Sequence, residues 1–319
     1  MSALPTHADV LAAAARIAGL AQVTPVRHST SLDALAGAEL HFKCENLQRV
    51  GAFKFRGACN AVWALSDAEA AQGVVTHSSG NHGAALALAA RSRGISAHVV
   101  VPTGAVPAKV AAIRAFGATV HECAPTQAAR DAMAAQVQQA TGARMVHPFT
   151  DPFVIAGQGT AALELLREVP GLDLLVTPVG GGGLVCGSAL AASGLASAPR
   201  VIGAEPEGAA DAHDSLARGQ RLTDLQPDTV CDGLRATIGP INFALMQAHA
   251  IEVLLVSDAE VMAAMRLAWE RLKLVIEPSA ATVLAAVLRH RERFAGRRVG
   301  LVLSGGNVDL DALGFRFGG

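Results

Sequence analysis

One lysine of the 319-residue chain stands in an unusual setting. The segment Gly51-Ala52-Phe53-Lys54-Phe55-Arg56-Gly57-Ala58 places its amine between two phenylalanines and bounds it with glycines. An amine in apolar surroundings loses its proton more easily, and a neutral amine forms Schiff bases with carbonyl compounds. The alternative is a surface lysine whose aliphatic stem covers the phenylalanines. The segment alone therefore leaves open whether Lys54 is a nucleophile.

A polar loop follows the strand that we expect at 74–76. It reads His77-Ser78-Ser79-Gly80-Asn81-His82-Gly83 and leads into a helix expected at 84–93. Hydroxyl, amide and imidazole groups then surround backbone N–H groups at a helix N-terminus, which is a setting that binds a carboxylate. One Ser, Asn or Gly would be enough for an ordinary helix cap. Because the loop consists of little else, we predict a carboxylate site.

Four successive glycines occur in Pro178-Val179-Gly180-Gly181-Gly182-Gly183-Leu184, between a strand expected at 174–177 and a helix expected at 184–193. Consecutive backbone N–H groups at the positive end of a helix suit a phosphate monoester. The run lacks the G-x-G-x-x-G spacing of dinucleotide folds and the Gly-Lys-Ser/Thr ending of a nucleotide P-loop. The phosphate therefore belongs to a smaller cofactor. A flexible linker, the alternative, does not fit inside so tight a joint.

A third loop, Ser304-Gly305-Gly306-Asn307-Val308-Asp309, follows a strand expected at 299–303. Its serine could reach a ring heteroatom or simply close a turn. In open α/β sheets the ligand lies at the carboxyl ends of the strands, so these three loops are expected to meet there. Together they describe a phosphate cradle, a carboxylate site and a candidate Schiff-base lysine.

The elements that must position these loops alternate between short strands and alanine-rich helices. Strands are expected at 41–44, 74–76, 97–101, 119–122, 174–177, 201–204, 253–256 and 299–303. Such alternation, with glycine at the joints, predicts an α/β fold with two doubly wound parallel sheets. Lys43 alternates with apolar residues in its strand and is expected on the solvent face, and Lys109 is expected on the surface of a helix.

Composition excludes several classes of protein. The chain is 51% hydrophobic and 17% charged with a formal net charge of -1, and no basic patch indicates a nucleic-acid partner. The apolar runs are too short to cross a membrane, and residues 1–20 are typical of an amphipathic helix, not of a signal peptide. The five cysteines are scattered, which favours reduced thiols in a cytoplasmic protein.

The loops, taken in order, resemble those of the fold-type II pyridoxal 5'-phosphate enzymes, whose fold is that of the tryptophan synthase β chain. The likeness is greatest to the serine/threonine dehydratase and serine racemase branch, which includes 3-hydroxyaspartate dehydratases. It is carried by the segments 43–48, 51–58, 78–83, 180–183, 276–278 and 304–307. The resemblance implies a discontinuous large cofactor-binding domain at 1–72 and 151–319, a small domain at 73–150, and a homodimer.

The resemblance also implies a role for each loop residue. Lys54 would hold pyridoxal phosphate as a Schiff base and act as a base at the substrate Cα. Phe53 would pack beside the ring, Asn81 would bind its 3'-oxygen, and Ser304 its nitrogen. The phosphate would be bound by Gly180, Gly181, Gly182 and Gly183. The substrate carboxylate would be surrounded by Ser78, Ser79, Asn81 and His82.

Two further groups of residues match the family. Glu205, Asp211 and the carbonyl of Ala209 match a divalent-cation site, whose hard oxygen ligands suit magnesium or calcium; a solvated acidic loop is the alternative. Arg130 aligns with an arginine that reads a distal acid group, and Arg235 lies in a segment expected beside the ring. A pair of arginines could bind a β-carboxylate, although each could also be a surface charge.

The resemblance implies elimination of water from serine, threonine or 3-hydroxyaspartate, which gives a 2-oxo acid and ammonia. Ser79 stands where serine racemases place a second base on the face opposite the lysine, so racemisation stays open. Ala84 and Phe116 depart from the nucleotide-contacting residues of the mammalian racemase, so the sequence does not predict nucleotide activation. A catalytically silent binding protein is the remaining alternative, and the intact Lys54 and Ser79 argue against it.

Overall fold

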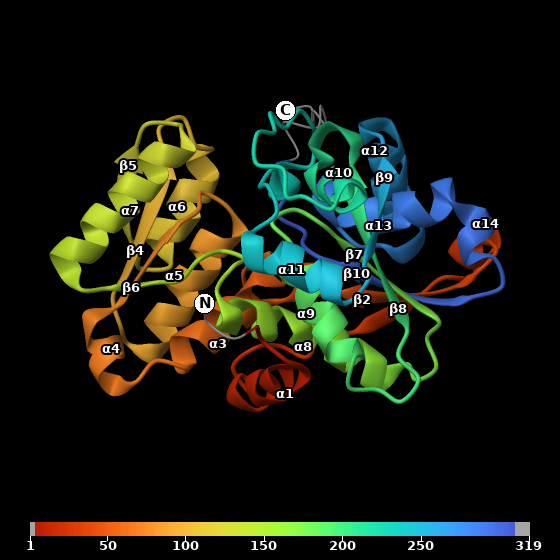
Figure 1. Cartoon of the computed structure of the whole chain (residues 1–319), viewed down its shortest axis with the longest axis horizontal. Helices are drawn as coiled ribbons and strands as arrows, with labels where there is room; N and C mark the ends of the chain where they lie inside the picture. The colour runs from red at the N-terminus through yellow and green to blue at the C-terminus, as the bar shows by residue number, and fades with distance from the viewer. Residues whose placement is uncertain (1–3, 310–319) are drawn as a thin grey trace.

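The computed structural model describes residues 4–309, which form two lobes joined by several crossings of the chain (Figure 1). Within that range the strands form two sheets, one of six strands in the order β1-β2-β10-β7-β8-β9 and one of four in the order β5-β4-β3-β6. The larger sheet contains β1 (Val26–His28), β2 (Glu39–Cys44), β7 (Leu174–Pro178), β8 (Arg200–Pro206), β9 (Glu252–Val256) and β10 (Arg298–Leu303). The smaller contains β3 (Val74–His77), β4 (Ala97–Pro102), β5 (Thr119–Cys123) and β6 (Arg144–Met145).

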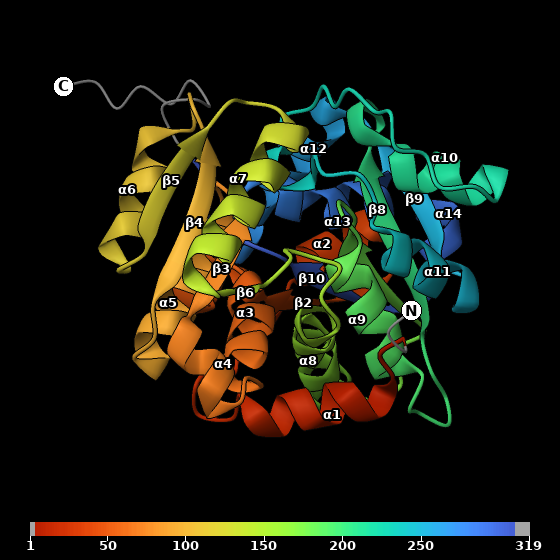
Figure 2. The same ribbon diagram turned by 60° about the vertical axis from the view of Figure 1, so that its left-hand side comes forward.

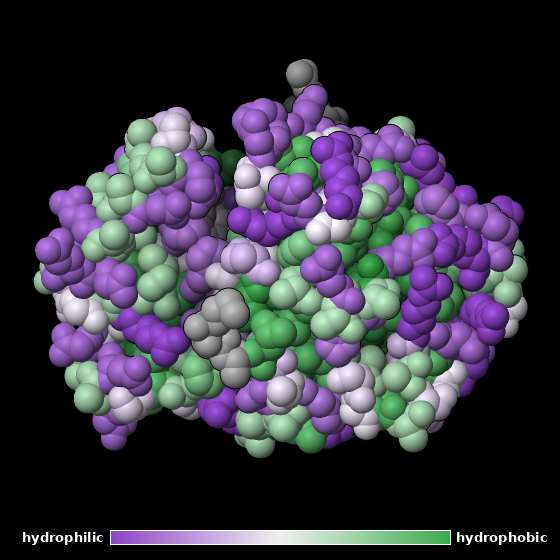
Figure 3. Space-filling model, in the orientation of Figure 1, coloured by the Kyte–Doolittle hydropathy of each residue, from purple (hydrophilic) through white to green (hydrophobic). Residues whose placement is uncertain are grey.

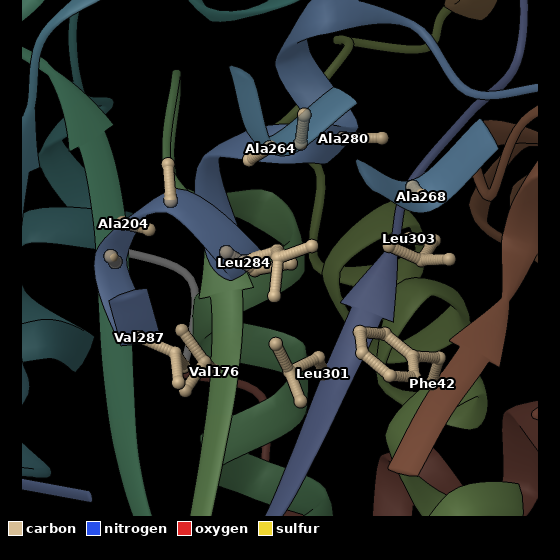
Figure 4. Close-up of a cluster of buried hydrophobic side chains, with 14 of the residues drawn as sticks. Phe42, Val176, Ala204, Ala264, Ala268, Ala280, Leu284, Val287, Leu301 and Leu303 are labelled. Carbon is tan, nitrogen blue, oxygen red and sulfur yellow. The ribbon is translucent and has the colours of Figure 1, made fainter. Parts of the chain in front are cut away.

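Helices cover both faces of the larger sheet. One face carries α2 (Thr30–Ala36), α12 (Asp258–Leu267) and α13 (Pro278–Arg289), and the other carries α1 (His7–Arg16), α8 (Pro152–Glu168), α9 (Gly183–Ala192) and α11 (Pro240–Ala248). The strands supply both cores because successive side chains point to opposite faces. In β10, Leu301 packs with Leu284 of α13, as Figure 4 shows, whereas Val302 belongs to the core under α8 and α9.

The smaller sheet is covered in the same way and is best seen in Figure 2. Val74 and Val99 join a core with α3 (Lys54–Trp63), α5 (Asn81–Arg93) and α6 (Pro107–Ala115). Val75 and Val100 face α7 (Gln127–Thr141) on the other side. Because α3 also packs against α8, it connects the two lobes.

The α/β class with two parallel sheets is confirmed. The sequence did not predict β1, which pairs antiparallel with β2, nor α2, α4 (Asp67–Gln72), α10 (Asp211–Arg218), α11 and the short α14 (Arg291–Phe294). The four-stranded sheet lies within the small domain predicted at 73–150, whose exact boundaries stay a prediction. Among residues 4–309, no helix combines the length and apolar character needed to cross a bilayer.

The expectation for Lys43 was wrong. Its side chain is fully buried, and its amine donates hydrogen bonds to the Glu164 carboxylate at 2.6 Å and to the Thr24 carbonyl at 2.6 Å. The alternating pattern identified a strand but not its covering, because α8 lies over this face of β2 and brings Glu164 to the amine. Lys109 is partly exposed, as expected, but its amine is bonded to the Asp232 carboxylate of the other lobe.

Candidate active site

Lys54 is the first residue of α3 and lies between the two lobes. Its amine donates a hydrogen bond to the Pro148 carbonyl at 3.1 Å and lies 5.0 Å from the centre of the Phe53 ring. Burial lowers the pKa of this amine to about 8, and the nearby Glu277 carboxylate opposes the shift. The apolar surroundings therefore make the neutral amine more abundant near physiological pH than it would be at an exposed lysine.

The glycine loop is built to leave the start of α9 open. Gly182, with φ +91°, precedes the helix, and no side chain caps it. A Cβ on Gly181 would lie 2.3 Å from the Phe149 ring, and one on Gly180 would lie 3.0 Å from the Leu234 Cα. Neighbouring segments thus require glycine, and the uncapped N–H groups of a buried helix start are left for an anion.

Ser304 follows β10 directly and lies beside the lysine segment. The Phe53 backbone N–H donates to the Ser304 carbonyl at 3.0 Å, and Ala52 forms a β-bridge with Gly305. The Ser304 side chain is buried. The structure therefore places the serine loop directly against the segment that carries Lys54, as the order of the motifs led us to expect.

The carboxylate loop, residues 77–83, follows β3 and leads into α5. The Gly80 N–H faces the Ser78 hydroxyl at 3.4 Å, and the Ser79 hydroxyl has no hydrogen-bond partner among residues 4–309. His82 is buried, with Nε2 at 3.2 Å from the Val146 carbonyl, and its Nδ1 has no partner in the described part of the chain. Burial and the charge of Lys54 hold the pKa of His82 well below its usual range, so the ring is neutral. Hydroxyl and imidazole groups are therefore free to meet a ligand.

Asn81 connects the carboxylate loop to the other lobe. Its Nδ2 donates to both Glu277 carboxylate oxygens at 3.2 Å, and its Oδ1 accepts from Asn307 Nδ2 at 2.9 Å. Burial raises the pKa of Glu277 to about 7. The sequence places Glu277 in one of the family segments but predicts no role for it. The sequence signal that could have pointed to Glu277 is an acidic residue that precedes a proline at the start of a helix and lies between two apolar segments.

The two arginines lie in different settings. The Nε of Arg130 is buried and has no hydrogen-bond partner within residues 4–309, and the charge of Arg130 contributes to the lowered pKa of His77 at the end of β3. Arg235 is exposed and donates to the Thr229 carbonyl at 2.6 and 3.2 Å. Arg130 thus lies beside the carboxylate loop with a donor to spare, whereas the guanidinium of Arg235 is bonded to its own loop.

The residues of the expected cation site come together at the end of β8. Glu205 and Asp211 are buried, and Ala209 lies between them in the chain. Burial and the neighbouring Asp211 carboxylate raise the pKa of Glu205 well above its usual value. The Oδ1 of Asp211 is buried and has no hydrogen-bond partner among the residues that the structure describes. No cluster of three or more His, Cys, Asp or Glu side chains suited to a metal occurs in the described part of the chain. A cation bound here would be coordinated by two carboxylates and one backbone carbonyl.

Sequence reasoning also missed contacts that only the fold creates. Two lie beside the lysine: the Pro148 carbonyl, which accepts a hydrogen bond from its amine, and the His147 ring. A third, the Lys109–Asp232 ion pair, joins the two lobes near Glu277. The surface is hollowed between the lobes (Figure 3). No sequence signal joins these residues, because they lie on segments up to 123 positions apart.

An amine of lowered pKa, an uncapped buried helix start and a buried serine next to the lysine segment define an enzyme that binds a phosphorylated carbonyl cofactor. The model of the family described as "Pyridoxal-phosphate dependent enzyme" matches residues 17–305, so the chain belongs to that family. The uncapped start of α9 and the neutral share of Lys54 fit the phosphate and the aldehyde of pyridoxal phosphate.

Known relatives cover the whole chain. It is 49% identical over 310 residues to a beta-hydroxyaspartate dehydratase of Paracoccus denitrificans, with 97% of this chain and 98% of the relative aligned. It is 42% identical to the L-threo-3-hydroxyaspartate ammonia-lyase of Saccharomyces cerevisiae, with 96% and 94% aligned. The structure of maize serine racemase superposes with a TM-score of 0.95 at 42% identity, covering 98% and 96%. The predicted branch of the family is confirmed.

Proposed function

We propose that this enzyme eliminates water from 3-hydroxyaspartate, giving a 2-oxo acid and ammonia, and that Arg130 binds the β-carboxylate. The observation that carries the proposal is the buried, unpartnered Nε of Arg130 beside the carboxylate loop. A buried guanidinium donor without an acceptor is costly unless a ligand supplies one. The two relatives that act on hydroxyaspartate support the same substrate class.

In the proposed reaction, some residues of the chain bind the substrate and others move its proton. The hydroxyls of Ser78 and Ser79 and the imidazole of His82 bind the α-carboxylate, and Lys54 takes the proton from Cα, since its lowered pKa leaves a neutral amine near pH 8. Bound pyridoxal phosphate supplies the electron sink that stabilises negative charge at Cα. Ser304, a hydroxyl and not a carboxylate, offers the ring nitrogen a neutral partner. A weaker sink favours prompt departure of the β-hydroxyl.

Racemisation is the second candidate activity, and one observation favours it. The Ser79 hydroxyl has no hydrogen-bond partner among the described residues, so it is free to act as a second acid–base group. With Lys54 on one face of Cα and Ser79 on the other, a proton removed from one side could be returned from the opposite side. The relation to maize serine racemase supports keeping both activities.

The proposal includes a bound divalent cation. Glu205, Asp211 and the Ala209 carbonyl would bind magnesium or calcium, because two buried carboxylates beside one another are stabilised by a divalent cation.

All five cysteines are buried free thiols, which supports a reducing compartment such as the cytoplasm. A homodimer is proposed from the resemblance alone. Arg235 would act, if at all, by leaving the Thr229 carbonyl for the substrate.

The test is a panel of serine, threonine and the diastereomers of 3-hydroxyaspartate, scored for ammonia, 2-oxo acid and inverted product. Arg130→Ala should raise the KM for hydroxyaspartate at least about tenfold, the worth of a charged hydrogen bond, and leave serine unchanged. Arg114→Ala, an exposed arginine of the same lobe, is the matched control. Hydroxyaspartate turned over no better than serine would exclude the proposed substrate, and absence of any turnover would leave only a binding protein.

A further inference from the structure

His147 lies at the junction of the three parts of the site. The next residue, Pro148, accepts the hydrogen bond from the Lys54 amine. Phe149, one further on, packs under the glycine loop, and its carbonyl accepts from Asn242 Nδ2 at 2.9 Å. The His147 ring itself makes an edge contact with His77, the first residue of the carboxylate loop, with centroids 5.2 Å apart. One imidazole is thus placed among the amine, the phosphate loop and the carboxylate loop.

The protonation of this ring is set by its own backbone. The N–H groups of Phe149 and Thr150 lie 3.4 and 3.2 Å from Nδ1, which therefore acts as the acceptor. Burial, with the positive charges of His77 and Lys54, lowers the pKa of His147 to about 4, and Asp131 opposes the shift. A neutral ring with Nδ1 as acceptor carries its proton on Nε2. Among residues 4–309, no group accepts a hydrogen bond from that nitrogen.

The position of the substrate follows from the residues around it. Its Cα must approach the Lys54 amine, and in the proposed function its β-carboxylate extends toward Arg130, which lies beside His77. His147 lies between these two ends, because it adjoins Lys54 through Pro148 and touches His77. The β-carbon and its hydroxyl therefore pass in front of this ring.

We propose that His147 donates a hydrogen bond from Nε2 to the β-hydroxyl of the substrate and so orients the C–O bond for departure. This inference rests on the proposed function. The Cβ–O bond breaks, its electron pair leaves with the oxygen, and the oxygen gains one proton to become water. Lys54 passes the proton that it takes from Cα to this oxygen, so the imidazole keeps its own proton. His147 is a specificity residue for hydroxyl as the leaving group.

The test compares leaving groups in the cofactor-loaded enzyme. His147→Asn and His147→Phe should lower kcat/KM for 3-hydroxyaspartate and serine by about 10- to 100-fold, the worth of one lost hydrogen bond in a closed site. Elimination of chloride from 3-chloroalanine should fall by less than about threefold, because chloride leaves without such a bond. Exchange of the Cα proton with heavy water should be unchanged. His98→Asn, another partly buried histidine of the same lobe, is the control.

Each result of the leaving-group comparison supports or overturns the proposed role of His147. Equal losses for hydroxyl and chloride substrates, or a loss of Cα exchange, would show that His147 only supports the fold and would overturn the inference. An unchanged rate with the hydroxy substrates would overturn it as well. Failure of the proposed function has a different signature: the wild-type enzyme would then turn over 3-hydroxyaspartate no better than serine, or eliminate no hydroxyl at all, before any variant is made.

Discussion

Arg56 is paired with Glu45 in a fully buried ion pair two residues after the reactive lysine. Its Nε donates to Glu45 Oε2 at 2.7 Å and its Nη2 to Oε1 at 2.8 Å, while Nη1 donates to Glu164 at 2.7 Å. Lys43 completes the group through the other oxygen of Glu164. Two cations thus match two carboxylates at the start of α3, and this buried cluster holds Lys54 in place.

Arg56→Met should destabilise the protein by about 3–5 kcal/mol, because it leaves the Glu45 carboxylate buried with its charge uncompensated. Urea denaturation of the cofactor-loaded enzyme measures the loss. Arg266→Met is the matched control, since Arg266 forms an exposed pair with Glu270 whose loss should leave the free energy of unfolding nearly unchanged. Equal effects of the two substitutions would show that the buried cluster adds nothing to stability.

Lys54→Ala should abolish both the visible absorbance of lysine-bound cofactor and turnover, because the variant lacks the buried amine that would form the Schiff base. The yellow colour of the purified protein and the release of ammonia from hydroxyaspartate report the two losses. Lys273→Ala, at an exposed lysine, should change neither. A Lys54→Ala variant that kept both properties would contradict the whole assignment of the site.

The pH dependence of the cofactor-free enzyme should report the lowered pKa of Lys54. Labelling of this amine by an acylating reagent should rise with a midpoint near pH 8, with Lys273 as an internal reference. A lysine whose pKa is lower in the folded state binds fewer protons there between about 8 and 10.5 than in the unfolded state. Folding stability from this group should therefore rise with pH across that window. A labelling midpoint near 10.5 would refute the shift.

The sequence predicted those parts of the site that depend on local chemistry. Lys54 and the run from Gly180 to Gly183 could be assigned because a Schiff base needs an amine in apolar surroundings and a phosphate needs free N–H groups. Partners that meet only through folding were not predicted. Lys43 was placed in solvent because its ion-pair partner, Glu164, lies 121 residues away on a helix whose packing no local pattern encodes. The acceptor state of His147 Nδ1 was hidden for the same reason, since it depends on a turn.

Glu277→Gln should change the acid side of the stability profile of the cofactor-free enzyme. Burial raises the pKa of Glu277 to about 7, so the folded state holds this proton more tightly than the unfolded state does. Stability from this group is full below about pH 4.5 and is lost as the pH rises to about 7. The variant should lose that decline, and Glu270→Gln, at an exposed residue, should keep it. Parallel profiles for wild type and Glu277→Gln would contradict the raised pKa.

Removal of a divalent cation should destabilise the enzyme through the carboxylates at the end of β8. A chelator should lower the melting temperature by roughly 2–5 °C, and excess magnesium or calcium should restore it, because a ligand bound only to the folded state adds stability by mass action. Glu205→Gln should abolish the response, since Glu205 is buried beside Asp211 and would bind the ion directly. Glu207→Gln, at an exposed residue paired with Arg289, should retain it. If the chelator changes neither melting temperature nor activity, the two carboxylates are held by their backbone hydrogen bonds to Ala212, His213 and Ile238 alone.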